Sequence, residues 1–506
     1  MLNPAYYTMQ QNATNFYLVK QLILRSRYLL KSPKYKKSKV IMGNTLTPKR
    51  MLRVSKTEVD MSQGEIITLL INFATPLLLG NIFQQLYNTV DTWVVGNYVG
   101  KNAFSAVGTL NPIINTLIGF FTGFSNGACV IIARHFGAGD KEKVSRAVHT
   151  FVAVTLILCL VFTVLGLVLT PYLLDMIKSP EEVRSEQSIY LSIYFAGVSG
   201  LLLYNTGSAI LRAVGNSVIP FIFLVISALL NIVLDLVFVI NFNLGTAGVA
   251  YATILSQMIS AILVFILLIK TDSSVKLNFK KIRIDFQLLK SIIIVGLPSA
   301  IQMSITAFSN IFVQSYINYF GSDVMGGWTA YSKLDQLLFL PMQSLALATQ
   351  TFVSQNLGRQ YTDRAKKGVI TALLSSIVCT VILIIPVIAF APKLVKFFID
   401  DNEAEVIRYG TMFLRMISPF YVACCFNQIF GGALRGAGKS TISMVIMLGS
   451  FVLARQVYLY ITANFISNTV IPICMGYPFG WILCSVLMLI SYLVSFKEKN
   501  LYKTKL

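Results

Sequence analysis

The sequence is poor in charged side chains and has almost no histidine. Among 506 residues, only 12% are Asp, Glu, Lys or Arg, and two are His. A soluble domain carries about 25% charged residues, so this composition excludes a water-soluble globular protein. An intramembrane enzyme would need clustered His, Cys or acidic groups, and neither His135 nor His149 has an obvious catalytic partner along the chain. We therefore expect no metal, no cofactor and no enzymatic activity.

The seven cysteines lack the spacing of a redox or zinc motif. No C-x-x-C pair occurs, and every cysteine lies in or beside an apolar run. A free cysteine in such a place behaves as a small hydrophobic residue. We interpret all seven as buried packing residues: Cys129, Cys159, Cys379, Cys424, Cys425, Cys474 and Cys484.

Acidic residues are half as frequent as basic ones, which gives a net charge of +21. A strongly basic chain can indicate nucleic acid as a partner. Here the basic residues lie between the apolar runs and at the two ends of the chain, which is typical of membrane topology. We therefore expect a monomer whose partners are small amphipathic molecules and membrane lipids, and no nucleic acid.

Long apolar runs make up most of the chain, with 55% hydrophobic residues and a mean hydropathy of +0.69. Runs of about 20 residues can cross a bilayer as helices. The sequence therefore predicts an all-α integral membrane protein with twelve transmembrane helices in a plasma membrane. We place the spans near residues 66–95, 104–133, 147–174, 188–211, 218–240, 247–269, 289–320, 328–355, 368–391, 406–433, 441–463 and 469–495.

The charges of the loops predict the orientation in the membrane. Seventeen basic residues lie in loops that follow even-numbered spans, and six lie in loops that follow odd-numbered spans. Because cytoplasmic loops carry the excess of Lys and Arg, both termini are expected in the cytoplasm.

The two halves of the chain repeat each other. Three anchors match at nearly one offset: Pro76 with Pro298, residues 133–150 with 354–371, and A-I-L-R-A-V-G-N-S (209–217) with G-A-L-R-G-A-G-K-S (432–440). Six spans per half give both repeats the same orientation, related by an axis along the membrane normal. Two such six-helix lobes around a central cavity predict an alternating-access transporter.

This repeat divides the chain into five parts. They are a basic extension (1–60), a first lobe (61–270), a cytoplasmic loop (271–287), a second lobe (288–496) and a basic cytoplasmic tail (497–506). The extension holds twelve Lys and Arg. It is either a disordered or membrane-surface arm, or the product of a start assigned too early, with Met51 or Met61 as the true start, which we favour.

The first span carries a polar stripe. Asn81, Gln84, Gln85, Asn88 and Asp91 fall within an arc of about 120° on a helical wheel. Such groups would lack partners in lipid, so the stripe must face other helices or a wet cavity. An ionisable residue inside a span indicates a functional site.

A second carboxylate lies in the fifth span. Asn231 and Asp235 are four residues apart and therefore share one helix face. Two carboxylates near each other either share a proton or hold a hard cation between their oxygens. The plain alternative is a structural set of hydrogen bonds between helices.

Several separated segments resemble the multidrug and toxic compound extrusion (MATE) transporters. They are Met61–Gly100, L-R-A-V-G-N-S (211–217), N-I-V-L-D (231–235) and A-Y-S-K-L-D-Q-L-L-F-L-P (330–341). The resemblance covers about residues 61–496. It implies two six-helix lobes in a V that export amphipathic, often cationic, compounds against entry of Na⁺ or H⁺. It also places one cation-coupling site in the first lobe, at Asp91, Asn205, Asn231, Asp235 and Thr253.

The second lobe departs from that pattern. By the repeat offsets, Asp91 falls opposite Phe312 or Val313, and Asp235 falls opposite Tyr458, so no carboxylate is repeated. A second coupling site there is in doubt. Polar groups still lie on one side of the seventh span, and with two from the first span we expect them to line the substrate cavity: Gln84, Asn88, Gln302, Thr306 and Ser309.

Lys333 and Asp335 lie at the external end of the eighth span. They could pair with each other or with a neighbour, or Asp335 could be a second titrating group; we favour a structural ion pair. For the whole chain, the alternative function is a flippase for lipid-linked saccharides. Such a protein would need a cationic cavity for the pyrophosphate, whereas the stripe of the first span is acidic and rich in amides.

The orientation can be tested in the loop between the lobes. A cysteine that replaces Asn278 should resist an impermeant thiol reagent in intact cells and react after the cells are opened, because this loop is expected in the cytoplasm. Labelling of that cysteine from outside would overturn the predicted topology.

Overall fold

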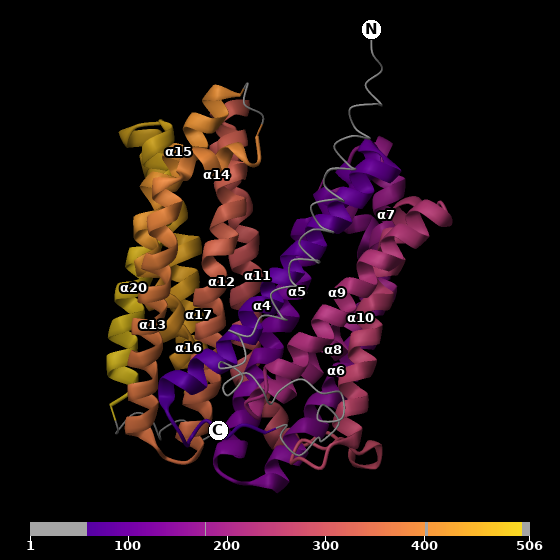
Figure 1. Ribbon diagram of the computed structural model, residues 1–506, viewed down its shortest axis with the longest axis vertical. Coiled ribbons are helices and arrows are strands. Elements are labelled where there is room, and N and C mark those ends of the chain that lie inside the picture. Colours follow the sequence, from indigo (N-terminus) through magenta and orange to yellow (C-terminus); the bar gives the residue numbers. More distant parts are fainter. Residues whose placement is uncertain (1–57, 178, 400–402, 498–506) are drawn as a thin grey trace, which may run out of the picture. The chain divides into compact units, whose positions relative to one another are not determined.

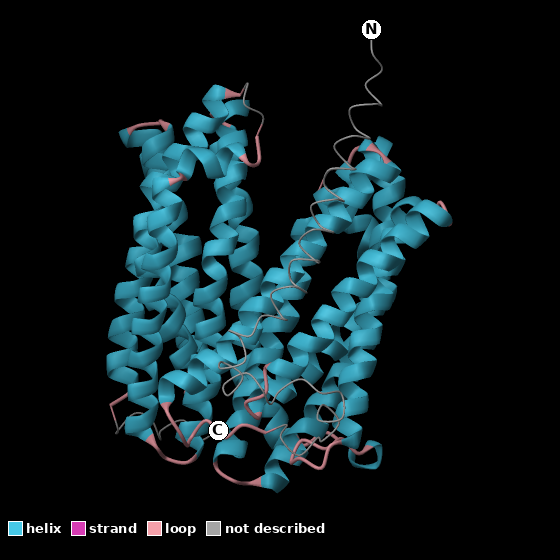
Figure 2. Cartoon of the chain, in the orientation of Figure 1, coloured by secondary structure: helices cyan, strands magenta, loops and turns pink. Residues whose placement is uncertain are grey.

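The computed structural model describes residues 58–177, 179–399 and 403–497, all of which belong to one compact unit spanning 57–506. These described residues fold into helices joined by short loops, without a strand among them (Figure 2). The basic extension lies outside the described residues except for Glu58–Asp60. The tail lies outside them except for Lys497.

The helices form two groups that follow the order of the chain (Figure 1). The first group consists of α4 (Ile66–Val94), α5 (Lys101–Gly137), α6 (Lys141–Met176), α7 (Glu181–Ala196), α8 (Val198–Ala213), α9 (Val218–Leu236) and α10 (Gly245–Lys270). The second consists of α11 (Phe286–Asn318), α12 (Ser322–Gly358), α13 (Thr362–Ala389), α14 (Ala391–Lys396), α15 (Ala404–Ile417), α16 (Tyr421–Gly436), α17 (Ser440–Leu448), α18 (Arg455–Ile461), α19 (Val470–Cys474) and α20 (Gly476–Ser495).

Short helical turns extend several of these helices. Wider π-helical turns follow α4, α9, α17 and α18, and single 3₁₀ turns lie in the loop between the lobes and between α15 and α16. Their bounds are Val95–Val99, Val237–Asn241, Gly449–Ala454 and Thr462–Ile466 for the π turns, and Phe279–Lys281 and Ser418–Phe420 for the 3₁₀ turns.

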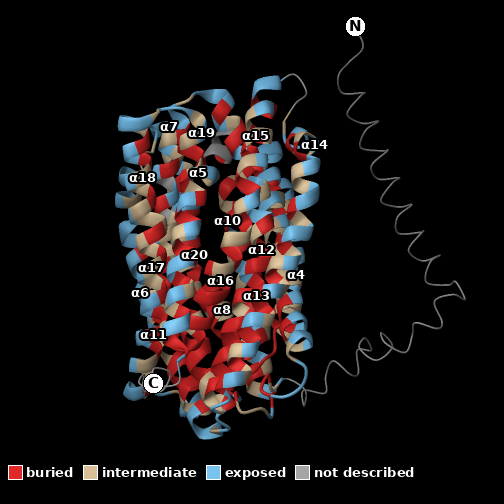
Figure 3. Ribbon diagram, turned by 90° about the vertical axis from the view of Figure 1, so that its left-hand side faces the viewer, coloured by how far each residue is buried: buried red, intermediate tan, exposed pale blue. Residues whose placement is uncertain are grey.

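The number of spans agrees with the sequence prediction. Eleven helical segments of the described chain are long and apolar enough to cross a membrane, and α7 with α8 makes a twelfth that is bent by 44°. Large apolar side chains remain exposed on the outer faces of the helices, among them Leu160, Val168 and Ile382, while buried residues fill the interior of the bundles (Figure 3). Such apolar outer faces suit contact with lipid.

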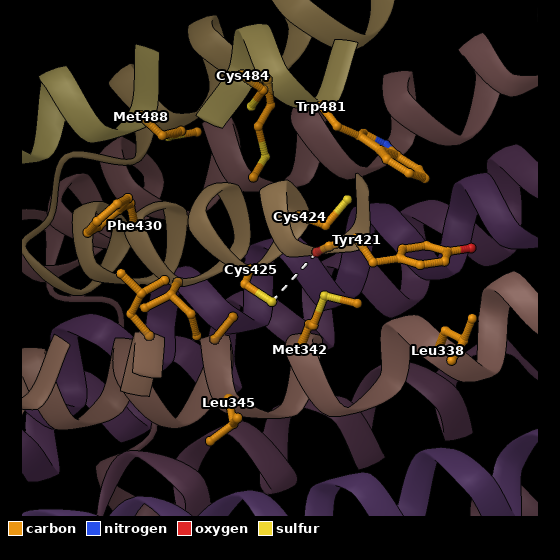
Figure 4. Close-up of a cluster of buried hydrophobic side chains, with 14 of the residues drawn as sticks. Leu338, Met342, Leu345, Tyr421, Cys424, Cys425, Phe430, Trp481, Cys484 and Met488 are labelled. Carbon is orange, nitrogen blue, oxygen red and sulfur yellow. Dashed lines mark hydrogen bonds between the residues drawn. The ribbon is translucent and has the colours of Figure 1, made fainter. Parts of the chain in front are cut away.

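The cysteines pack as predicted. All seven are free, six are buried, and Cys379 is half-buried. In the second bundle, Cys424 and Cys425 of α16 and Cys484 of α20 lie in one apolar cluster with Tyr421 and Trp481 (Figure 4). Their role is therefore to fill space.

The two bundles meet where α5 packs on α11 and α12, and where α4 packs on α12. α5 and α12 are both 37 residues long and are equivalent in the repeat. A Cβ added at Gly137, which ends α5, would collide with the backbone of Gln355, and one added at Gly358, which ends α12, would collide with the carbonyl of Arg134. Only glycine lets the two backbones approach this closely.

The opposite ends of the same two helices stand free. Gly100 and Gly321 precede α5 and α12, and a Cβ added at either would meet no atom within 4 Å. The bundles are therefore in backbone contact at the end of Gly137 and Gly358, called here the closed end, and apart at the other (Figure 1).

The segment that precedes α4, residues 58–65, contacts both bundles at the closed end. The Val59 N–H donates to the carbonyl of Val214 in the first bundle, at 2.8 Å. The Met61 N–H donates to Oε1 of Gln355 in the second bundle, also at 2.8 Å. Nη2 of Arg359 lies 2.9 Å from Oδ2 of Asp60. The segment thus joins the two bundles.

The loop between the lobes is anchored on α6. Nε2 of His149 accepts a hydrogen bond from the Asn278 N–H at 3.0 Å, and Nδ1 lies 2.6 Å from the Ser145 carbonyl. This arrangement places the ring proton on Nδ1, so His149 has a structural role. Asp285 caps α11 by accepting from the N–H groups of residues 287 and 288, and it also pairs with Arg146.

Gln355 offers a test of the closed end. Its side chain accepts from Met61 N–H and donates to the carbonyl of Ala213 at 2.8 Å, so Gln355→Leu leaves two buried backbone groups unpaired. At about 1 kcal/mol for each lost bond, opening of this end should become roughly tenfold or more easier. Alkylation of Cys129, in a chain whose other cysteines are replaced, should accelerate accordingly.

The matched control is Gln287→Leu, because Gln287 is exposed at the start of α11. It should leave the alkylation rate of Cys129 unchanged. Equal rates in Gln355→Leu and the unmodified chain would show that these bonds do not hold the closed end.

Candidate ion-coupling site and central cavity

A cavity of about 610 Å³ lies between the two bundles, lined by residues of both. Amides are the most frequent polar side chains of its lining, twelve in all, including Gln84, Asn205, Asn231, Gln302 and Asn310. An amide both donates and accepts hydrogen bonds, so this surface can solvate polar groups of either kind.

Three of the five expected cavity residues line this space: Gln84, Gln302 and Thr306. The other two are not among its lining residues. Asn88 is exposed on α4, and Ser309 is buried, where its Oγ accepts from Nη2 of Arg455 at 3.0 Å. The helical wheel did not reveal that Ser309 faces Arg455 of another helix and not the cavity.

The predicted ion-coupling residues come from four helices of the first bundle. Asp91 is on α4, Asn205 on α8, Asn231 and Asp235 on α9, and Thr253 on α10. α4 packs on α9, and α10 packs on both α8 and α9. Asn231, Asp235 and Thr253 are buried, with 2%, 0% and 6% of their surface exposed.

The structure brings the two acids together. Asp91 and Asp235 are close enough for their carboxyl groups to interact directly. Both oxygens of Asp235 and one oxygen of Asp91 are buried without a hydrogen-bond partner among the described residues. A hydrogen bond between two carboxyl groups requires a proton on one of them, and two ionised groups require a cation.

Two neutral side chains of the predicted ion-coupling set are also buried without hydrogen-bond partners. Both amide atoms of Asn231 and Oγ1 of Thr253 are buried and lack a partner among the described residues. Native proteins pair the great majority of such atoms. Asn205 differs, because its Nδ2 donates to the carbonyl of Leu201 at 2.9 Å and leaves its oxygen available. The donor set consists of oxygens and amides, which suits Na⁺ or a proton.

Two tyrosines complete the surroundings of Asp91. Tyr87 and Tyr190 are both close enough to interact electrostatically with it. Tyr87 precedes Asp91 by one helical turn, so the i, i+4 spacing could have indicated it. Tyr190 comes from α7, and no pattern in the sequence connects it with α4.

The expected pair of Lys333 and Asp335 does not form. Oδ1 of Asp335 accepts from the hydroxyl of Tyr331 at 3.1 Å and from that of Tyr421, while Lys333 is exposed. The prediction was wrong because residues two apart on a helix do not face each other. Phenol hydroxyls, and not a cation, therefore hold this carboxyl group.

The second bundle buries an arginine near the positions that are equivalent to Asn231 and Asp235 of the first. Ala454 is the repeat equivalent of Asn231, and the next residue, Arg455, is 3% exposed. Nη2 of Arg455 donates to Asn310 Oδ1 at 3.0 Å as well as to Ser309, and its guanidinium lies 4.8 Å from the Tyr477 ring centre. The two bundles thus share a scaffold and differ in the sign of their buried charge.

Comparison with known proteins places this geometry in a family. The family model described as MatE matches residues 76–237 and 298–461, one segment in each bundle. The chain belongs to the MatE family. As a member of that family it is a multi-pass membrane transporter and not an enzyme.

Relatives match nearly their whole length. The chain is 27% identical over 433 residues to the "Probable multidrug resistance protein YpnP" of Bacillus subtilis (strain 168), covering 86% of this chain and 96% of the relative. It is 23% identical over 399 residues to the "Multidrug export protein MepA" of Staphylococcus aureus (strain MSSA476), covering 77% and 86%.

Solved structures share the fold. A structure described as "Outward-facing conformation of a multidrug resistance MATE family transporter of the MOP superfamily" superposes with a TM-score of 0.82 at 22% identity, covering 88% of this chain and 98% of that one. A structure of a MATE protein in complex with MaL6 superposes with a TM-score of 0.83 at 22% identity, covering 89% of this chain and 100% of that one. The fold expected from the sequence is confirmed.

The paired acids of this MatE protein should bind a cation measurably. Na⁺ or acid should raise the melting temperature of the purified protein, because a ligand of the folded state stabilises it, by about 1.4 kcal/mol at ten times its Kd. Asp235→Asn should abolish the response, since one carboxyl group alone no longer needs a shared ion.

Asp335→Asn is the matched control, because that carboxyl group already has two phenol donors. It should keep the response of the unmodified protein. The same ion response in Asp235→Asn as in the unmodified protein would mean that these acids only join helices.

Proposed function

We propose that this MatE protein is an antiporter that exports amphipathic compounds with a cationic group in exchange for Na⁺ or H⁺. The observation that carries the proposal is the pair of buried carboxyl groups, Asp91 and Asp235, beside an amide-lined cavity. The printed names of the relatives, multidrug resistance and multidrug export proteins, support drug-like substrates.

The coupling follows from competition for one bundle. Asn231 lines the cavity and lies one turn before Asp235 on α9, so the ion site and the substrate site share a helix. A bound ion removes the repulsion between the acids and favours one packing of α4 on α9, whereas the substrate favours another. Differential binding to two states is sufficient to couple the two movements.

The membrane potential supplies part of the driving force. Each positive charge that enters gains about 2.3 kcal/mol per 100 mV. With the closed end on the cytoplasmic side, as the loop charges predict, the cavity of this conformer faces outward. Release of substrate and uptake of the ion would both occur in this state.

We further propose that the protein acts as a monomer in the plasma membrane, with lipid around its apolar outer faces and both termini in the cytoplasm. The apolar side chains exposed on the outer helix faces support contact with lipid.

One observation favours the alternative, a flippase for lipid-linked saccharides. Two arginines, Arg212 and Arg435, are among the residues that line the cavity. A pyrophosphate would need such cations. The two functions differ in whether an ion gradient drives a soluble dye across the membrane.

Transport in proteoliposomes tests the proposal. Efflux of a fluorescent organic cation should follow an imposed Na⁺ or pH gradient, and Asp91→Asn should abolish it while the protein still folds, because the switchable charge is lost. Asp335→Asn should retain most of the activity. Normal efflux in Asp91→Asn together with loss in Asp335→Asn would place the coupling site in the second bundle.

A further inference from the structure

The charges that line the central cavity are arginines. Among its described lining residues, Arg212 and Arg435 carry the formal charges, and no carboxylate lines it. Asp91 and Asp235 lie behind the lining, within the first bundle. We infer that the cavity holds the substrate by an oxyanion group, a carboxylate or a phosphate, at Arg212 and Arg435. This inference rests on the proposed function and adds an anionic group to its amphipathic substrate.

The two arginines are equivalent in the repeat. Arg212 lies in the last turn of α8, and Arg435 lies in the last turn of α16, within the matching motifs of residues 209–217 and 432–440. Each bundle therefore contributes one guanidinium to the same cavity. The duplication kept these cations on both sides, although it did not keep the acids.

Arg212 has no protein counter-ion. Its side chain forms no salt bridge and no hydrogen bond with a described residue, and its Nε is buried. A guanidinium has five N–H donors, and a buried charge without a partner is costly. Its electrostatic neighbours are Cys129 and Tyr204, neither of which carries a negative charge at neutral pH. An oxyanion would supply both the charge and the acceptors.

Arg435 is only partly satisfied. Its Nε donates to Oε1 of Gln350 at 3.2 Å, and its Nη1 donates to Oγ of Ser443 at 3.3 Å. Gln350 in turn donates to the carbonyl of Asn126 on α5 at 3.0 Å. Neutral groups therefore orient this guanidinium across the interface of the two bundles, and no carboxylate neutralises it among the described residues.

A helix C-terminus also attracts cations, and this effect alone could account for a positive charge at both positions. An arginine with that role normally donates to the last carbonyl groups of its helix. Arg212 makes no such bond. The C-terminus of α8 therefore favours a positive charge at Arg212. It does not explain why the N–H donors of that guanidinium remain unpaired in a cavity.

The test uses two dyes that differ in one group. Rhodamine 110 carries a free carboxylate, and rhodamine 123 is its methyl ester, so the pair shares a cationic ring system and differs in the oxyanion. Fluorescence anisotropy with the purified full-length protein should show tighter binding of the acid. Arg212→Gln should weaken binding of the acid about tenfold, as expected for loss of a charge-assisted bond, and leave the ester unchanged.

Three further variants support the measurement. Arg283→Gln, at an exposed arginine of the loop between the lobes, should leave both dyes unaffected. Arg212→Lys should restore part of the preference for the acid over the ester. Lysine keeps the positive charge but lacks the planar, two-pronged set of N–H donors of a guanidinium. Arg435→Gln should also weaken binding of the acid. If the Arg212→Gln protein does not fold, Arg435→Gln takes its place in the test.

The source of the oxyanion is decided by a third probe. Farnesyl diphosphate that competes with rhodamine 110 in an Arg212-dependent manner supports the site and identifies a lipid diphosphate as its ligand. Equal affinity for acid and ester, or an equal loss of both in Arg212→Gln, overturns the inference.

Gradient-driven efflux of the ester without preference for the acid overturns the inference and leaves the antiporter intact. Absence of any gradient-driven efflux defeats the proposed function. Binding of the acid to the unmodified protein and to Arg212→Gln still decides the inference in that case, because binding needs no gradient.

Discussion

Two carboxyl groups held side by side in the interior of a helical bundle set the main constraint on this molecule. Asp91 and Asp235 interact directly, and Asp235 is fully buried without a hydrogen-bond donor among the described residues. Two ionised carboxylates at this separation would repel each other, so the packing of α4 on α9 requires a proton or a cation at the pair. Because α9 also lines the cavity through Asn231, the coupling proposed above needs only that an ion at the acids changes the packing of this one helix.

A change in the packing of the first bundle acts on the second bundle through the closed end. α5 and α12 are in backbone contact at Gly137 and Gly358, and the segment 58–65 binds Val214 on one side and Gln355 on the other. Movement of the bundles must break these bonds together, since Gln355 serves both the segment and Ala213. Apolar side chains also cross the interface, since Leu70 and Phe73 of α4 pack in the core of the second bundle and Ile292 and Val295 of α11 pack in that of the first.

The sequence was sufficient for the fold because hydropathy and an internal repeat are both periodic features. It also found the acids, since a carboxylate inside an apolar span is costly and is usually kept for a function. It failed where contacts depend on tertiary packing. Ser309 binds Arg455 from another helix, Asp335 is held by Tyr421 from α16, and Tyr190 approaches Asp91 from α7. None of these partners has a fixed spacing along the chain.

The repeat shows which features the two lobes share and where their interiors differ. Duplication preserved the glycines at the ends of α5 and α12, where the backbones meet, and the arginines at the ends of α8 and α16, which line the cavity. The interior of each bundle was free to diverge, toward two acids in the first and Arg455 in the second. In the proposed mechanism, an ion that binds at the acids therefore acts on the packing of the first lobe. The cavity between them, lined by amides that accept or donate as needed, can then take ligands of varied chemistry, while its few fixed charges set which ionic groups it prefers.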